Sequence, residues 1–112
     1  MNHFRYDVPG EPVTDFHSSG VRSTALAHGR GEAHIYALTF EPGGVIGEHT
    51  AGFDQLFYVL EGTAWVVVDG ERVEVATHEA ATINLGSIHS KGSEHGARVL
   101  MVQIASLENP RE

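Results

Sequence analysis

Short runs in which apolar and polar residues alternate recur along the chain, and glycines separate many of them. In residues 33–40, the side chains of His34, Tyr36, Leu38 and Phe40 fall on one face, which is the period of a half-buried β-strand. Further apolar runs of strand length lie at residues 21–27, 56–61, 64–69, 82–85 and 99–105. No stretch keeps a helical period, so the pattern predicts an all-β chain.

Turn-forming residues between these runs support the same fold class. Asp69-Gly70 separates two apolar runs and is a strong signal for a two-residue β-hairpin. Residues 29–31 and 41–44 are predicted to be further turns, and thirteen glycines in 112 residues suit many short strands. Such a succession is typical of a barrel or a two-sheet jelly roll.

The length of the chain sets its predicted organisation. A chain of 112 residues can bury one small core, so we predict a single domain over residues 1–112. Residues 1–20 contain two prolines and several turn formers, and they are expected to be irregular. Residues 106–112 are mostly polar and include Pro110, so they are expected to form a fraying tail.

Composition excludes several classes of function. There are no cysteines, which excludes disulfides, thiolate metal sites and cysteine nucleophiles. The net charge is −8 and the basic residues are scattered, which argues against binding to nucleic acid. No apolar run approaches the ~20 residues of a membrane helix. The first residues lack the apolar core of a signal peptide, so a cytoplasmic location is expected.

The stretch from Gly43 to Gly62 resembles the first motif of the cupin superfamily. That motif reads Gly, five residues, His-x-His, three residues, Glu, six residues, Gly. Gly43, His49 and Gly62 stand at the required spacing. Ala51 replaces the second histidine and Gln55 replaces the glutamate, so two of the three usual metal ligands of this motif have changed.

Residues 78–93 are similar to the second cupin motif, which reads Gly, five residues, Pro-x-Gly, two residues, His, three residues, Asn. Gly86 and His89 match this pattern, whereas its other positions differ. The resemblance spans residues 43–93. It implies an all-β double-stranded β-helix, which is a barrel of the jelly-roll type.

The resemblance implies that His49, Gln55 and His89 project into the barrel, where they could hold a divalent metal ion. Imidazole and oxygen donors suit several metals, so Zn, Fe, Ni and Mn stay open. A neutral amide in place of the glutamate is expected to weaken metal binding. The alternative is a site without metal, in which His49 and His89 form hydrogen bonds with Gln55 or water.

Each of several other residues near the motifs has two possible roles. Three histidines could supply a missing ligand, although each is more often an ordinary surface or hydrogen-bonded residue: His34, His78 and His95. Asp54 could act as a base or replace the glutamate, but its position favours a turn. Four aromatic residues could line a ligand cavity or simply form core: Tyr36, Phe40, Phe57 and Trp65.

The leading hypothesis is therefore a small metal-dependent cupin that binds or transforms a small organic molecule inside its barrel. If it is an enzyme, the family implies a dioxygenase, isomerase or lyase. The alternative is a metal-free binding or accessory protein with a degenerate metal site. The family also implies a homodimer, to which residues 1–27 could contribute.

Overall fold

The computed structural model describes residues 1–108 and is almost entirely β-structure. The elements in chain order are β1 (His3–Arg5), β2 (Glu11–Pro12), a 3-10 turn η1 (Asp15–His17), β3 (Arg22–Ser23), β4 (His28–Phe40), β5 (Val45–Thr50), β6 (Asp54–Val68), β7 (Glu71–Ala76), β8 (Glu79–Ile83), β9 (Ile88–Gly92) and β10 (Ala97–Glu108). Residues 106–108 of the predicted tail belong to β10, whereas residues 109–112 lie outside the described part. The all-β fold class is confirmed.

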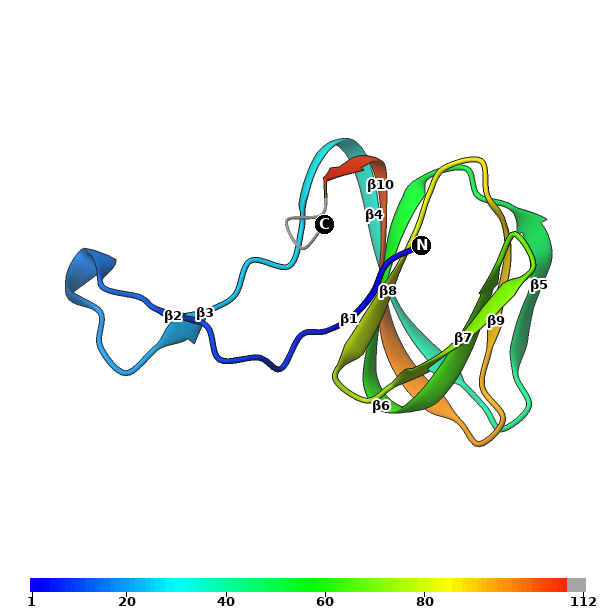
Figure 1. The fold of residues 1–112 in the computed structure, drawn as a ribbon, viewed down its shortest axis with the longest axis horizontal. Coiled ribbons are helices and arrows are strands. Elements are labelled where there is room, and N and C mark those ends of the chain that lie inside the picture. The colour runs from blue at the N-terminus through cyan, green and yellow to red at the C-terminus, as the bar shows by residue number, and fades with distance from the viewer. Residues whose placement is uncertain (109–112) are drawn as a thin grey trace.

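The strands form two antiparallel layers that face each other (Figure 1). One layer has the order β1-β8-β6-β10-β4, and the other consists of β7, β9, β5 and the second half of β6. Their inner faces enclose a core of apolar side chains that includes Phe57, Val59, Val66, Val75, Ile83 and Val99. This is the jelly-roll barrel that the resemblance implies.

The strand β6 belongs to both layers. It pairs with β8 and β10 up to Gly62, and with β7 and β9 beyond it. Gly62 has a φ of 80°, and a Cβ atom there would collide with the carbonyl oxygen of Gly96. The two strands predicted on either side of Gly62 are therefore one long strand, because glycine lets the backbone pass from one layer to the other.

Two turn predictions have opposite outcomes. Asp69 and Gly70 both have positive φ, of 48° and 84°, and they connect β6 to β7 as the predicted hairpin. Residues 29–31, predicted to be a turn, lie inside β4 instead. That strand pairs with β10 along its length, with an irregularity between Ile104 and Ser106 that accommodates the glycines.

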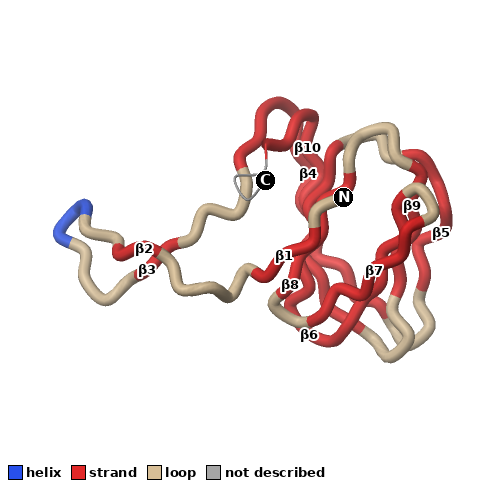
Figure 2. The backbone as a smooth tube through the Cα atoms, in the orientation of Figure 1, coloured by secondary structure: helices blue, strands red, loops and turns tan. Residues whose placement is uncertain are grey.

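The N-terminal segment leaves the barrel after its first strand. β1 pairs with β8 at the sheet edge, so residues 1–20 are not wholly irregular. Beyond β1 the chain extends away as an arm carrying β2, η1 and β3 before it returns at β4 (Figures 1 and 2). The strand predicted at residues 21–27 shrinks to two residues, because β2 is its only partner among residues 1–108. No helix in the described residues is long and apolar enough to cross a membrane.

Candidate functional site

The pairing of β5 with β9 brings two histidines together, one buried and one exposed. His49 lies directly opposite His89, and the centroids of their imidazole rings are 4.3 Å apart. The register shifts between Ile46 and His49. This irregularity allows Ile46 and His49, which are three residues apart, to face the same side, whereas a regular strand would turn them to opposite faces.

His89 is a buried imidazole without a hydrogen-bond partner. Its side chain is fully buried, and neither ring nitrogen has a partner within residues 1–108. Burial, followed by the positive charge of Lys91 and then His49, lowers the pKa of His89 from 6.5 to about 4. At neutral pH it is therefore an uncharged ring with one N–H donor and one acceptor nitrogen.

His49 lies at the exposed side of this pair, and its Nδ1 is 2.8 Å from the carbonyl oxygen of Gly47. A carbonyl can only accept, so Nδ1 of His49 donates this hydrogen bond. The tautomer that carries its proton on Nδ1 has a lone pair on Nε2.

Gln55 contacts Lys91, which neither cupin motif identifies as a site residue. Lys91 is buried, and its Nζ donates a hydrogen bond of 2.5 Å to Oε1 of Gln55. The same Nζ lies 3.2 Å from the sulfur of Met101 and 5.6 Å from the ring centroid of Phe57. Burial lowers the pKa of Lys91 from 10.5 to about 8, so the amine remains mostly an ammonium at neutral pH.

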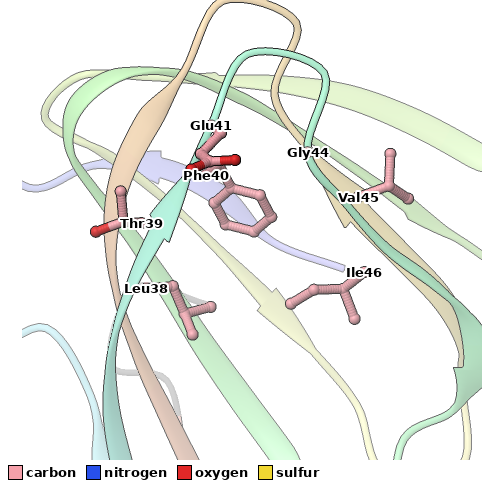
Figure 3. Close-up of a pocket in the computed structure, with 7 residues that line it drawn as sticks. All are labelled: Leu38, Thr39, Phe40, Glu41, Gly44, Val45 and Ile46. Carbon is pink, nitrogen blue, oxygen red and sulfur yellow. The ribbon is translucent and has the colours of Figure 1, made fainter.

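The barrel wall is open between β4 and β5. Among residues 1–108, β4 pairs only with β10 and β5 pairs only with β9. A cavity of about 420 Å³ lies at this gap, where Leu38, Phe40 and Ile46 project toward one another (Figure 3). Ile46 is the register partner of Lys91, so the apolar gap lies beside the strand position from which the Lys91 side chain starts.

A family model for the cupin domain matches residues 36–103, which is more than half of the chain. This chain belongs to the cupin family. A comparison with curated proteins gives no significant match.

Solved structures support the cupin fold. The chain is similar to an RmlC-like cupin from Shewanella frigidimarina, with a TM-score of 0.63, 20% identity and coverage of 67% of this chain and 68% of that one. A predicted oxalate decarboxylase from Thermotoga maritima matches with a TM-score of 0.59, 22% identity and coverage of 63% and 64%. The salicylate 1,2-dioxygenase from Pseudoaminobacter salicylatoxidans, solved as a mutant with gentisate, matches with a TM-score of 0.61, 16% identity and coverage of 65% and 20%. This chain spans less than two thirds of the last two proteins.

The donor set of this cupin fits a divalent metal only in part. His49 and His89 are adjacent and have nitrogen atoms free for a ligand bond. The third candidate does not fit, because the oxygen of Gln55 is bound to an ammonium rather than free for a cation. Within the described residues, no three or more histidine, cysteine or carboxylate side chains are grouped so that they could hold a metal ion.

Lys91 is the buried residue of this site that the cupin motifs do not identify. It stands two residues after His89, and residues i and i+2 share a face of a strand. This spacing indicates that Lys91 faces the interior, because the motif predicts that His89 does. A second signal is that Lys91 is the only lysine in the sequence.

The alternative histidines lie away from this site. His34 pairs with Glu32 and contacts the rings of Tyr36 and Phe53. The side chains of the other two are 53% and 93% exposed, and they lie near Asp7 and Glu94, respectively: His78 and His95. The structure therefore does not bring any of them to the pair of His49 and His89.

Two of the four candidate aromatic residues face the interior. Phe40 and Phe57 are buried core residues whose ring centroids are 6.2 Å apart. Trp65 alternates with buried valines on β6 and packs under Arg72, with 4.9 Å between the guanidinium carbon and the ring centroid. Tyr36 is 46% exposed. Of these four aromatic residues, Phe40 lines the cavity between β4 and β5.

Asp54, at the start of β6, holds the loop after β8 and the last residues of β10 in place. Its two carboxylate oxygens accept hydrogen bonds from the backbone amides of Leu85 and Leu107, at 2.7 and 2.8 Å. Asp54→Ala is expected to lower the free energy of unfolding by about 1–3 kcal/mol, measured by urea denaturation, because both amides lose a charged acceptor. Asp54→Asn keeps one acceptor oxygen and should lose less. Equal stability of the alanine variant and the parent would contradict a structural role.

Proposed function

We propose that this chain is a cytoplasmic cupin that binds a small organic molecule inside its barrel without requiring a metal ion. The observation that carries the proposal is the hydrogen bond between Lys91 and Gln55. Gln55 stands where the family motif has an anionic ligand, and here its oxygen faces a positive charge supplied by the protein itself. A dication beside that ammonium would be repelled, which disfavours metal binding.

A second candidate is the metal-dependent cupin, in which His49, His89 and Gln55 hold a Zn, Fe, Ni or Mn ion. The observation in its favour is that both nitrogens of buried His89 lack a partner while His49 lies beside it. Such a metal would polarise a substrate oxygen or activate O2 as a dioxygenase, isomerase or lyase requires. This candidate requires the Lys91 side chain to leave Gln55.

Elemental analysis separates the two candidates. Protein purified without a metal-chelating tag is expected to contain far less than one equivalent of any transition metal. The matched control is His89→Gln, which removes the buried imidazole and should contain the same residual amount. A stoichiometric metal in the parent that disappears in His89→Gln would overturn the metal-free proposal and establish the second candidate.

We further infer that the protein is a homodimer. Within residues 1–108, one edge of the long strand β4 has no partner strand. Phe16 and Val21 on the arm are 93% and 53% exposed, and Ile35 on β4 is 66% exposed. Free strand edges and apolar side chains of this kind favour association. Light scattering at micromolar concentration is expected to give the mass of two chains, and Phe16→Ser should shift the equilibrium toward monomer. A monomeric parent would contradict the inference.

A further inference from the structure

Lys91 places a positive charge inside the barrel, and no ion pair within residues 1–108 gives it a negative partner. Its side chain is buried, and its contacts are neutral: the amide oxygen of Gln55, the sulfur of Met101 and the face of Phe57. None of the ion pairs among residues 1–108 includes Lys91, although the sequence has 15 acidic residues and only 7 basic ones. A buried charge without a counter-charge is costly, which favours an anion from outside the chain.

A second unsatisfied group faces the same side of β9. His89 stands two residues before Lys91, is fully buried, and has no hydrogen-bond partner at either ring nitrogen within the described residues. As a neutral imidazole it has one N–H to donate. An ammonium and an N–H donor on one face of a strand can together receive a ligand group with two acceptor oxygens.

The apolar gap beside the strand position of Lys91 indicates the chemical nature of the rest of the ligand. The cavity of about 420 Å³ between β4 and β5 is bordered by Leu38, Phe40 and Ile46, and Ile46 is the register partner of Lys91. Aliphatic and aromatic walls favour a hydrocarbon body over a second charged group. The size is at the lower end of small-molecule sites, which suits a ligand of a few carbon atoms or one ring.

We propose that Lys91 and His89 receive the carboxylate of a small organic acid whose apolar part points toward the gap between β4 and β5. The carboxylate takes the place of the Gln55 oxygen at the ammonium, and the amide group of Gln55 can then donate to it. This inference rests on the proposed function and narrows its ligand class. In this barrel the cation that holds the ligand is an amine of the chain.

The presence of only one lysine makes a direct experiment available. Protein grown with ¹³C-labelled lysine has a single lysine Cε signal, which belongs to Lys91. We expect acetate and benzoate to shift this signal saturably in the unmodified protein, while the neutral isosteres acetamide and benzamide leave it unchanged. Chloride and inorganic phosphate at matched ionic strength test whether any anion suffices.

A variant series checks that the shift reports binding. Lys91→Met is expected to bind benzoate at least tenfold more weakly by calorimetry, whereas Arg72→Met, which removes an exposed cation on the outer face, should bind as the parent does. The proposal is overturned if neither acid shifts the Lys91 signal, if the amides or phosphate shift it equally, or if Lys91→Met binds benzoate as tightly as the parent. Binding of the amides alone by metal-free protein would refute the carboxylate and leave the proposed function standing. Stoichiometric metal in the protein would refute the proposed function itself.

Discussion

Gln55→Leu is expected to lower the free energy of unfolding by about 2–4 kcal/mol, because it leaves the ammonium of Lys91 buried with no oxygen acceptor among its described contacts. Leucine is similar to glutamine in size, so the loss does not come from a large cavity. Urea denaturation monitored by the fluorescence of Trp65, the only tryptophan, measures the change.

The variant Lys91→Met tests whether the lost stability comes from the uncompensated charge of Lys91 or from poor packing of the new leucine. Lys91→Met replaces the amine with an apolar chain of similar length, and the double variant Gln55→Leu/Lys91→Met has neither polar group. Replacing both members of a buried polar pair with apolar groups is often neutral or stabilising, so the double variant should regain most of the lost stability. A coupling energy of about 1–3 kcal/mol is expected from the cycle. If the two single changes simply add, Lys91 and Gln55 do not act as a pair.

The features of the fold that could be predicted are those determined by local sequence. Asp69-Gly70 forms its hairpin because both residues tolerate positive φ, which few residue pairs do. The alternation from His34 to Phe40 identifies a strand because only one face is packed on the core. The spacing of the cupin motifs likewise identified His49 and His89, which the structure places directly opposite each other.

The features that could not be predicted depend on pairing between distant segments. Residues 29–31 have the composition of a turn, yet β10 draws them into β4 by providing a row of hydrogen-bond partners. The motif predicts that Gln55 projects into the barrel, and its side chain is buried, but nothing near it in sequence indicates an ammonium from β9. A lone lysine between serine and glycine is typical of a surface position. Its burial depends on facing the same way as His89 once β9 pairs with β5 and β6.

Ala51 illustrates how a motif position can change its role. The family pattern has a histidine there, and the structure shows alanine in the core cluster, 2% exposed. Its backbone remains engaged, since its amide bonds the carbonyl of Ser87 and its carbonyl accepts from Gly86. The backbone frame of the motif is thus retained while a ligand position has become packing.

Acid is expected to destabilise the protein through His89. The pKa of this ring is about 4 in the folded state because of burial and the nearby charge of Lys91, against 6.5 as its ordinary value. Between pH 6.5 and 4 the unfolded chain therefore binds a proton that the folded chain does not. The contribution of neutral His89 to stability is fully present above pH 6.5 and is lost as the pH falls through 4, on the order of 3 kcal/mol in total.

Acid also acts on other groups, because the pKa values of the Asp7 and Glu79 carboxyls are lowered in the folded state and their stabilisation is lost as these groups are protonated. A variant that lacks only His89 separates its contribution from theirs. His89→Gln is similar in size and does not titrate. From pH 7 to pH 4, the free energy of unfolding of the parent should therefore fall by about 2–3 kcal/mol more than that of His89→Gln. His95→Gln removes a histidine whose side chain is 93% exposed, and its curve should run parallel to that of the parent. A constant difference for His89→Gln over this range would mean that the pKa of His89 is the same in the folded and unfolded states, and that burial of the imidazole does not shift it.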